Sequence, residues 1–248
     1  MIGANNMFAI CQYSAMTAIF AHRGLHQNAA ENTVAAFVEA KAAGADGVEL
    51  DVRRTSDGAL IVHHDATIDG IGAIHQLLLR DIPPGVATLH DAMTACSGLD
   101  VNLEIKNDPD EAGYDASGAL AAQVVSAVND AAWASKVIFS SFDLATCEAV
   151  RGIDSDVAVG WLLDWRREAA PSVAIVAERG LNAIHPFFQR TDAALVDAAH
   201  SCGLAVNVWT VNFADELTRL FNLDVDTVIT DDPVLALFTL GARQPRLI

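Results

Sequence analysis

Short apolar segments alternate with longer alanine-rich segments along most of the chain. The short segments have the length and composition of buried strands, and the alanine-rich segments are long enough to form helices. Strands are expected at residues 18–22, 47–52, 60–64, 100–106, 136–142, 157–163, 182–187, 205–211 and 226–230. Helices are expected near residues 33–43, 88–96, 114–132, 143–151, 171–179, 191–202, 214–221 and 233–240. This repeated strand–helix order predicts a parallel sheet covered by helices.

The first helix has the clearest ends. Asn32 is a good N-cap, although it could instead contact a functional site, and Gly44 supplies a C-terminal stop. Val34, Phe37 and Val38 form the apolar stripe that we expect this helix to bury.

The length of one connection separates a strand from the rest. Only residues 53–59 join the strands 47–52 and 60–64, whereas a parallel crossover needs about a dozen residues or more. Asp57 and Gly58 in this connection are a strong hairpin signal. We therefore expect a (β/α)8 TIM barrel with one extra antiparallel hairpin strand after the second barrel strand, and no large insertion domain.

No Pro/Gly/Ser-rich linker divides the chain, whose 248 residues suit one barrel of this kind. We expect an N-terminal arm at residues 1–17, a single catalytic domain at residues 18–241 and a C-terminal tail at residues 242–248. Residues 1–21 carry no charge, but they lack the basic start of a secretory leader. No segment reaches the roughly 18 apolar residues of a membrane span.

The formal net charge of −17 argues against nucleic acid or an anionic membrane surface as a partner. A small anionic substrate is still compatible, because local cations or a metal ion can override the distant field. The cysteines, Cys11, Cys96, Cys147 and Cys202, show no metal-ligand spacing, so we expect reduced thiols packed as small apolar side chains. These features favour a cytoplasmic enzyme whose oligomeric state the sequence leaves open.

Acidic side chains recur at every second position in two of the expected strands. Because strand side chains alternate between faces, Glu49 and Asp51 share one face, and so do Asn102, Glu104 and Lys106. The alternative is that these residues face solvent, but helices cover the outside of a barrel, so we expect them inside. Three carboxylates make an oxygen-only ligand set suited to Mg2+, Ca2+ or Mn2+ rather than Zn2+.

Two histidines lie at comparable strand ends, His22 on the first strand and His64 on the hairpin strand. A lone histidine is more often structural, but two beside inward-facing carboxylates favour acid/base catalysis. Arg23 and Lys106 add positive charge of the kind that holds a phosphate. Together these residue types indicate phosphoester chemistry. His185 ends another strand and could lie at the same rim, although a structural role is favoured.

A series of short motifs follows in order along the chain: His22-Arg23-Gly24, Glu31-Asn32-Thr33, Ala35-Ala36-Phe37, Gly44-Ala45-Asp46-Gly47-Val48-Glu49-Leu50-Asp51-Val52, Thr55-Ser56-Asp57-Gly58 and His64-Asp65. The series continues with Glu104-Ile105-Lys106, Ser141-Phe142, Trp209-Thr210-Val211-Asn212 and Ile229-Thr230-Asp231. This ordered run resembles the signature of the glycerophosphodiester phosphodiesterase family. The resemblance covers essentially residues 18–233.

The resemblance implies a barrel related to phosphoinositide-specific phospholipase C. It implies one divalent cation on Glu49, Asp51 and Glu104, with His22 and His64 as the acid/base pair. The glycerol 2-hydroxyl would attack phosphorus, giving a cyclic phosphate that water opens to glycerol 3-phosphate and an alcohol. Which histidine is the acid stays open.

The resemblance also assigns contacts with the substrate. Arg23 and Lys106 would contact the phosphate, and Trp209 and Phe142 would line the substrate pocket, although packing alone would explain both aromatic residues. The chain departs from the family pattern in having Ala30 where a proline is usual, and in a short segment after His64 where many members carry an insertion. The active site is therefore expected to be more open.

Three rival functions share parts of this pattern. A lysophospholipase D-type enzyme would keep the metal and the histidines but act on lysolipids, and an exposed apolar rim would favour it. A metal-dependent sugar isomerase or aldolase would use similar groups for proton transfer at carbon, but Arg23, Lys106 and His64 speak against it. A catalytically inactive binding module would have no need for the full set of matched polar residues.

Overall fold

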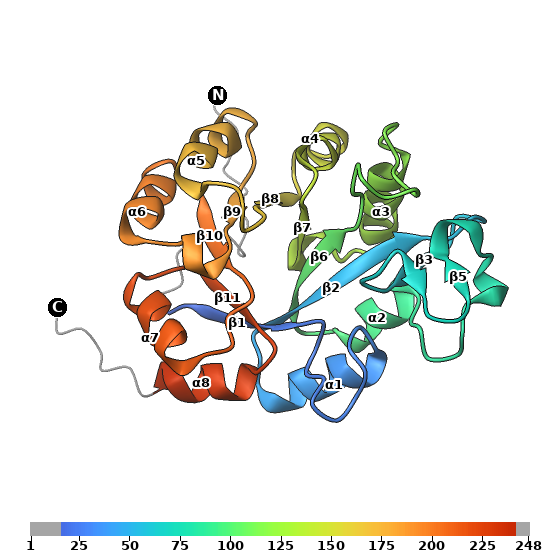
Figure 1. The fold of residues 1–248 in the computed structure, drawn as a ribbon, viewed down its shortest axis with the longest axis horizontal. Helices are drawn as coiled ribbons and strands as arrows, with labels where there is room; N and C mark the ends of the chain where they lie inside the picture. The colour runs from blue at the N-terminus through green and yellow to red at the C-terminus, as the bar shows by residue number, and fades with distance from the viewer. Residues whose placement is uncertain (1–15, 242–248) are drawn as a thin grey trace.

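The computed structural model describes residues 16–241, in which eight parallel strands close into a barrel (Figure 1). The strands follow the order β1-β11-β10-β9-β8-β7-β6-β2, and pairing of β1 with β2 completes the ring. Their bounds are Ala18–His22 (β1), Gly47–Arg54 (β2), Asp100–Ile105 (β6), Val137–Ser141 (β7), Ala158–Leu162 (β8), Ala183–His185 (β9), Ala205–Val208 (β10) and Thr227–Thr230 (β11). The expected fold is confirmed, although β9 and β10 are shorter than predicted.

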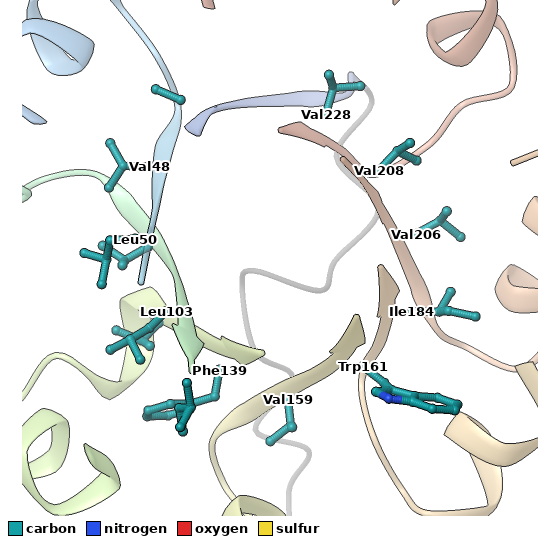
Figure 2. Packing of buried hydrophobic residues seen from close by; sticks show 14 of the residues in the cluster. Val48, Leu50, Leu103, Phe139, Val159, Trp161, Ile184, Val206, Val208 and Val228 are labelled. Carbon is teal, nitrogen blue, oxygen red and sulfur yellow. The ribbon is translucent and has the colours of Figure 1, made fainter. Parts of the chain in front are cut away.

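Helices surround the barrel on the outside (Figure 1). Their bounds are Val34–Ala43 (α1), Leu89–Ala95 (α2), Ala119–Asp130 (α3), Leu144–Ile153 (α4), Ala169–Glu178 (α5), Ala193–Ser201 (α6), Ala214–Asn222 (α7) and Pro233–Gly241 (α8). Figure 2 shows Val48, Leu103, Val159 and Val206 pointing outward from their strands into the main hydrophobic core. The opposite face of each strand therefore points into the barrel, and it carries both buried polar side chains and a second apolar cluster, Ile138, Ala158, Ala183 and Ala205.

Helix α1 buries only part of the face that was predicted. Its buried residues include Ala36, Phe37 and Ala40, whereas Val34 and Val38 are 41% and 51% exposed. The small alanines allow α1 to approach the barrel closely. A Cβ atom at Gly24 would lie only 2.7 Å from the carbonyl carbon of the residue that faces it, Ala36. The predicted apolar stripe is therefore confirmed for Phe37 and wrong for Val34 and Val38, which lie on the solvent side.

The N-cap of α1 is Thr33, whose side chain accepts a hydrogen bond from the backbone N–H of Ala36. The prediction that Asn32 caps the helix is therefore wrong, and the alternative, a contact with the site, is what the structure has. Gly44 does end the helix, in the left-handed conformation with φ 87°.

The extra strand β3 (Leu60–Val62) pairs antiparallel with the end of β2, outside the barrel. The predicted strand 60–64 is therefore too long, and His64 lies in the loop that follows. A two-stranded sheet that was not predicted comes next, formed by β4 (Thr67–Ile68) and β5 (Gly72–Ala73). No large insertion domain occurs in the described chain, as expected.

His185 is completely buried in the barrel, so the prediction that it could reach the rim is wrong. The amide of Asn207 donates to its Nε2 at 2.9 Å, and burial lowers the pKa of His185 to about 3. Its ring occupies space that Gly160 on β8 leaves free, because a Cβ atom there would lie 2.7 Å from His185 Cδ2. His185 is therefore a neutral packing residue.

Replacing Gly160 with alanine is expected to destabilise the protein by about 1–3 kcal/mol, because the new methyl group overpacks the barrel against His185. Urea unfolding would measure the shift of the midpoint. The control is Gly152→Ala in α4, where an added Cβ meets nothing within 4 Å and should be neutral or slightly stabilising. Equal stability of the two variants would contradict the packing argument.

The described cysteines differ in their exposure to solvent. Cys96 and Cys147 are buried free thiols, but Cys202 is exposed because it stands at the C-cap of α6, where the chain turns away. The expectation of a packed thiol is wrong for Cys202, and Cys11 lies outside the described residues.

Residues 1–15 of the predicted arm and the whole predicted tail also lie outside the described residues. None of the helices in residues 16–241 has the length and apolar character needed to cross a membrane.

Candidate active site

The predicted site residues meet at the carboxyl ends of the barrel strands. Of the nine, eight line one pocket with about 420 Å³ of empty space: His22, Arg23, Glu49, His64, Glu104, Lys106, Phe142 and Trp209. The ninth, Asp51, is buried beside them. Strand register explains the meeting, because His22 on β1 is level with Glu49 on β2, and Asp51 is level with Glu104 on β6. The barrel therefore brings every predicted residue into one place.

Glu49, Asp51 and Glu104 form a buried carboxylate cluster, with exposures of 3%, 1% and 8%. One oxygen of each lies within 4.8 Å of the others. Glu49 Oε1 and Asp51 Oδ1 are buried and accept no hydrogen bond within the described chain. Burial, together with the charges of Asp51 and Glu104, raises the pKa of Glu49 well above its ordinary 4.5. Converging carboxylates with two buried oxygens that accept no hydrogen bond fit a hard divalent cation.

Two basic side chains compensate part of this negative charge. Lys106 Nζ lies 2.8 Å from Glu104 Oε1 and 3.6 Å from Asp51 Oδ1, and Arg23 Nε lies 3.3 Å from Asp51 Oδ2. Burial alone would raise the pKa of Asp51, but Lys106 and Arg23 hold it below its ordinary value. Asp51 is therefore ionised. The repulsion among the carboxylates acts instead on Glu49, whose pKa is raised.

Asn32 fixes Asp51 from the other side. Its Nδ2 donates to Asp51 Oδ2 at 2.8 Å, and its Oδ1 accepts from the backbone N–H of Asp51 at 3.3 Å. Asn32 adopts φ 58°, a left-handed conformation that asparagine tolerates better than most residues. The loop before α1 thus belongs to the site.

Each histidine is oriented through Nδ1 by an aspartate. His22 Nδ1 lies 2.6 Å from Asp231 Oδ1, just beyond β11, and His64 Nδ1 lies 2.7 Å from Asp65 Oδ1. Although burial would raise the pKa of Asp231, the hydrogen bond from His22 lowers it, so its carboxylate is ionised and can only accept. Because Nδ1 of His22 is occupied, its Nε2, which lies 3.9 Å from Glu49 Oε2, is the nitrogen that can exchange a proton with a bound molecule.

Replacing Asp231 with asparagine is expected to lower kcat by about 10- to 100-fold, because His22 loses the partner that sets its orientation and tautomer. KM should change little, since Asp231 does not line the pocket. Steady-state kinetics would test this against Asp232→Asn, because Asp232 caps α8 and does not contact His22. Equal activity of the two variants would contradict the orienting role.

Two aromatic rings form an apolar wall of the pocket. Phe142 and Trp209 meet edge to face with centroids 5.3 Å apart, and Trp209 Nε1 donates to the carbonyl of His185 at 2.9 Å. Lys106 Nζ lies 5.8 Å from the centroid of Phe142. Both rings therefore lie beside the charged groups of the pocket.

The barrel and the residues that line its mouth fit a phosphoric diester hydrolase. A model of the Glycerophosphoryl diester phosphodiesterase family matches residues 22–235, and the chain belongs to that family. Its reaction is accordingly the hydrolysis of a phosphoric diester.

Individual relatives agree with this assignment. The chain is 30% identical to a glycerophosphodiester phosphodiesterase of Caldanaerobacter subterraneus, over 88% of this chain and 95% of the relative. The solved structure of a glycerophosphodiester phosphodiesterase from Thermotoga maritima is similar with 26% identity and a TM-score of 0.72, over 92% of this chain and 98% of that one. A phosphodiesterase of Oleispira antarctica, solved with the product sn-glycerol-3-phosphate, has the same fold with 22% identity and a TM-score of 0.78, over 92% and 98%.

Proposed function

We propose that the chain hydrolyses glycerophosphodiesters to glycerol 3-phosphate and an alcohol, using one divalent cation and a pair of histidines. The observation that carries this proposal is that a buried cluster of three carboxylates lies at the pocket that two aspartate-oriented histidines also line. The product complex of the Oleispira antarctica protein supports the choice of product. The catalytic domain of this proposal spans residues 18–241, with the arm 1–17 and the tail 242–248 outside it.

The cation would be held by Glu49, Asp51 and Glu104, whose oxygen-only donors suit Mg2+, Ca2+ or Mn2+. When bound, it would supply Lewis-acid stabilisation of the charge on the phosphoryl oxygens. Lys106 and Arg23 keep Asp51 ionised and therefore ready to act as a ligand.

The side chains around the cluster would handle the phosphate and the protons. Arg23 and Lys106 line the pocket and would contact the phosphate oxygens. One histidine, His22 or His64, would take the proton of the glycerol 2-hydroxyl as its oxygen forms a bond to phosphorus. The other would protonate the alcohol oxygen as its bond to phosphorus breaks. Water would then open the cyclic phosphate, with the two proton transfers reversed.

Phe142 and Trp209 would lie against the carbon skeleton of the substrate, because their rings form the apolar side of the pocket. No large insertion covers the pocket in the described chain, so the alcohol group of the substrate would extend toward solvent. We therefore expect tolerance of different alcohols at this position.

The direct test is glycerol 3-phosphate release from a panel of glycerophosphodiesters and lysophospholipids, with Mg2+, Ca2+, Mn2+ or EDTA. Release from the diesters that is lost in EDTA would establish the reaction and reveal the metal and the preferred alcohol. Release of a head group from lysolipids alone would instead assign a lysophospholipase D-type reaction. Turnover that is unaffected by EDTA would refute the metal site.

A further inference from the structure

A buried arginine that the proposed reaction does not use lies next to the site. Arg53 is on β2, two residues beyond Asp51 on the same face, and is only 7% exposed. We propose that Arg53 is a positioning residue: its hydrogen bonds to the backbone carbonyl of His64 keep the His64 side chain in the pocket. This inference rests on the proposed role of His64 in proton transfer.

The guanidinium of Arg53 binds two groups at once. Its Nε and Nη2 donate to the carbonyl oxygen of His64 at 2.8 and 2.6 Å. Its Nη1 and Nη2 donate to the carboxylate of Glu111 at 2.6 and 3.0 Å. A planar guanidinium held bidentately by a carboxylate has little freedom to rotate. Glu111 therefore fixes the direction in which Arg53 presents its other donors to His64.

His64 needs such a support more than His22 does. His22 ends a barrel strand that pairs with a neighbour on each side, whereas His64 lies in a loop beyond the three-residue strand β3. Its side chain is 36% exposed, and its aspartate partner, Asp65, is 72% exposed. Beyond β3, the loop is hydrogen-bonded to β2 through the His63 N–H, which donates to the carbonyl of Asp51 at 3.0 Å, and through the contact of Arg53 with His64.

The chain contains a matched control at the next position. Arg54 points to the other face of β2, and its guanidinium lies 3.6 Å from Asp115 rather than near His64. Both arginines therefore pair with an acidic residue of the segment between β6 and α3, but only Arg53 contacts the histidine loop.

The experiment compares Arg53→Met, Arg53→Lys, Arg54→Met and His64→Ala by steady-state kinetics on a glycerophosphodiester. Mn2+ affinity is measured by calorimetry, and thermal unfolding confirms that each variant is folded. Arg53→Met should lower kcat by about 10- to 100-fold, the scale seen when a residue that orients a functional side chain is lost. KM and the Mn2+ Kd should stay within about twofold, because neither ligand contacts Arg53 in the proposed reaction. Arg53→Lys should recover part of kcat by donating to the His64 carbonyl, and Arg54→Met should match the wild type.

A double variant distinguishes positioning from general structural damage. In the His64→Ala background, Arg53→Met should reduce the residual rate by less than about twofold, because the side chain that it positions is gone. A full additional loss in that background, or parallel changes in KM and Mn2+ Kd, would overturn the positioning role. Wild-type kcat in His64→Ala would overturn the proposed acid/base role as well. Loss in His64→Ala without loss in Arg53→Met would overturn only the inference about Arg53.

Discussion

Replacing His22 with alanine is expected to lower kcat for a glycerophosphodiester by about 10²- to 10⁴-fold, the range that a general acid or base contributes. The residue lines the pocket, and Asp231 holds its Nδ1, so its Nε2 is the group that would exchange a proton with the substrate. Glycerol 3-phosphate release at saturating metal and substrate would measure the effect.

His26 provides the control for this prediction. Its Nε2 lies 3.6 Å from the same Asp231 oxygen, but the residue does not line the pocket. His26→Ala should therefore keep kcat within about threefold of the wild type, a change smaller than the smallest contribution expected of an acid or base. If the two variants lose activity equally, the role belongs to the local fold around Asp231 rather than to His22.

Replacing Glu49 with glutamine is expected to lower activity by more than about 100-fold, because the change removes a proposed ligand and weakens metal affinity. The same change should remove a pH dependence from the metal-free protein. The pKa of Glu49 is raised in the folded state, so its contribution to stability is complete below the ordinary 4.5 and is lost as the pH rises through the raised value. Above about pH 4.5, the metal-free wild type should therefore lose stability relative to Glu49→Gln.

Thermal unfolding in EDTA at several pH values above 4.5 would test this second effect, and a divalent cation should reverse it in the wild type. Asp51 does not interfere with this comparison. Because its pKa is lowered in the folded state, its effect on stability changes only below pH 3.8, where stability falls as the pH falls. Asp100→Asn is the control, since Asp100 lies at the opposite end of β6 and pairs with the exposed Lys136. If the thermal stability of Glu49→Gln in EDTA changes with pH as that of the wild type does, the buried cluster does not raise the pKa of Glu49 as argued.

The sequence predicts the centre of the site well because that centre depends on local rules. Alternation along β2 puts Glu49 and Asp51 on one face of that strand, and alternation along β6 does the same for Glu104 and Lys106. Closure of the barrel turns both of these faces inward. The short connection before β3 likewise identifies the hairpin without knowledge of tertiary contacts. These features need only strand periodicity and loop length.

The supporting residues were harder to predict because they depend on contacts between distant parts of the chain. Asp231 meets His22 across 209 residues of sequence, and in the sequence it reads equally well as a polar residue before a helix. Asn32 has the side chain of a helix cap, but its left-handed backbone turns the amide toward Asp51. The buried face of α1 depends on how closely Ala36 can approach Gly24, which hydrophobic periodicity does not measure.

The hairpin strand β3 has a consequence for how the enzyme fails. Apart from a single bridge from Ile61 to Thr88, β3 pairs only with β2 among residues 16–241, whereas each barrel strand has a neighbour on both sides (Figure 1). Segments with few partners open at a lower free energy than the core and exchange their amide hydrogens sooner. The loop that carries His64 therefore belongs to a weaker cooperative unit than the carboxylates on β2 and β6. Local unfolding of this loop would remove His64 from the pocket while the three carboxylates proposed to bind the cation stay assembled.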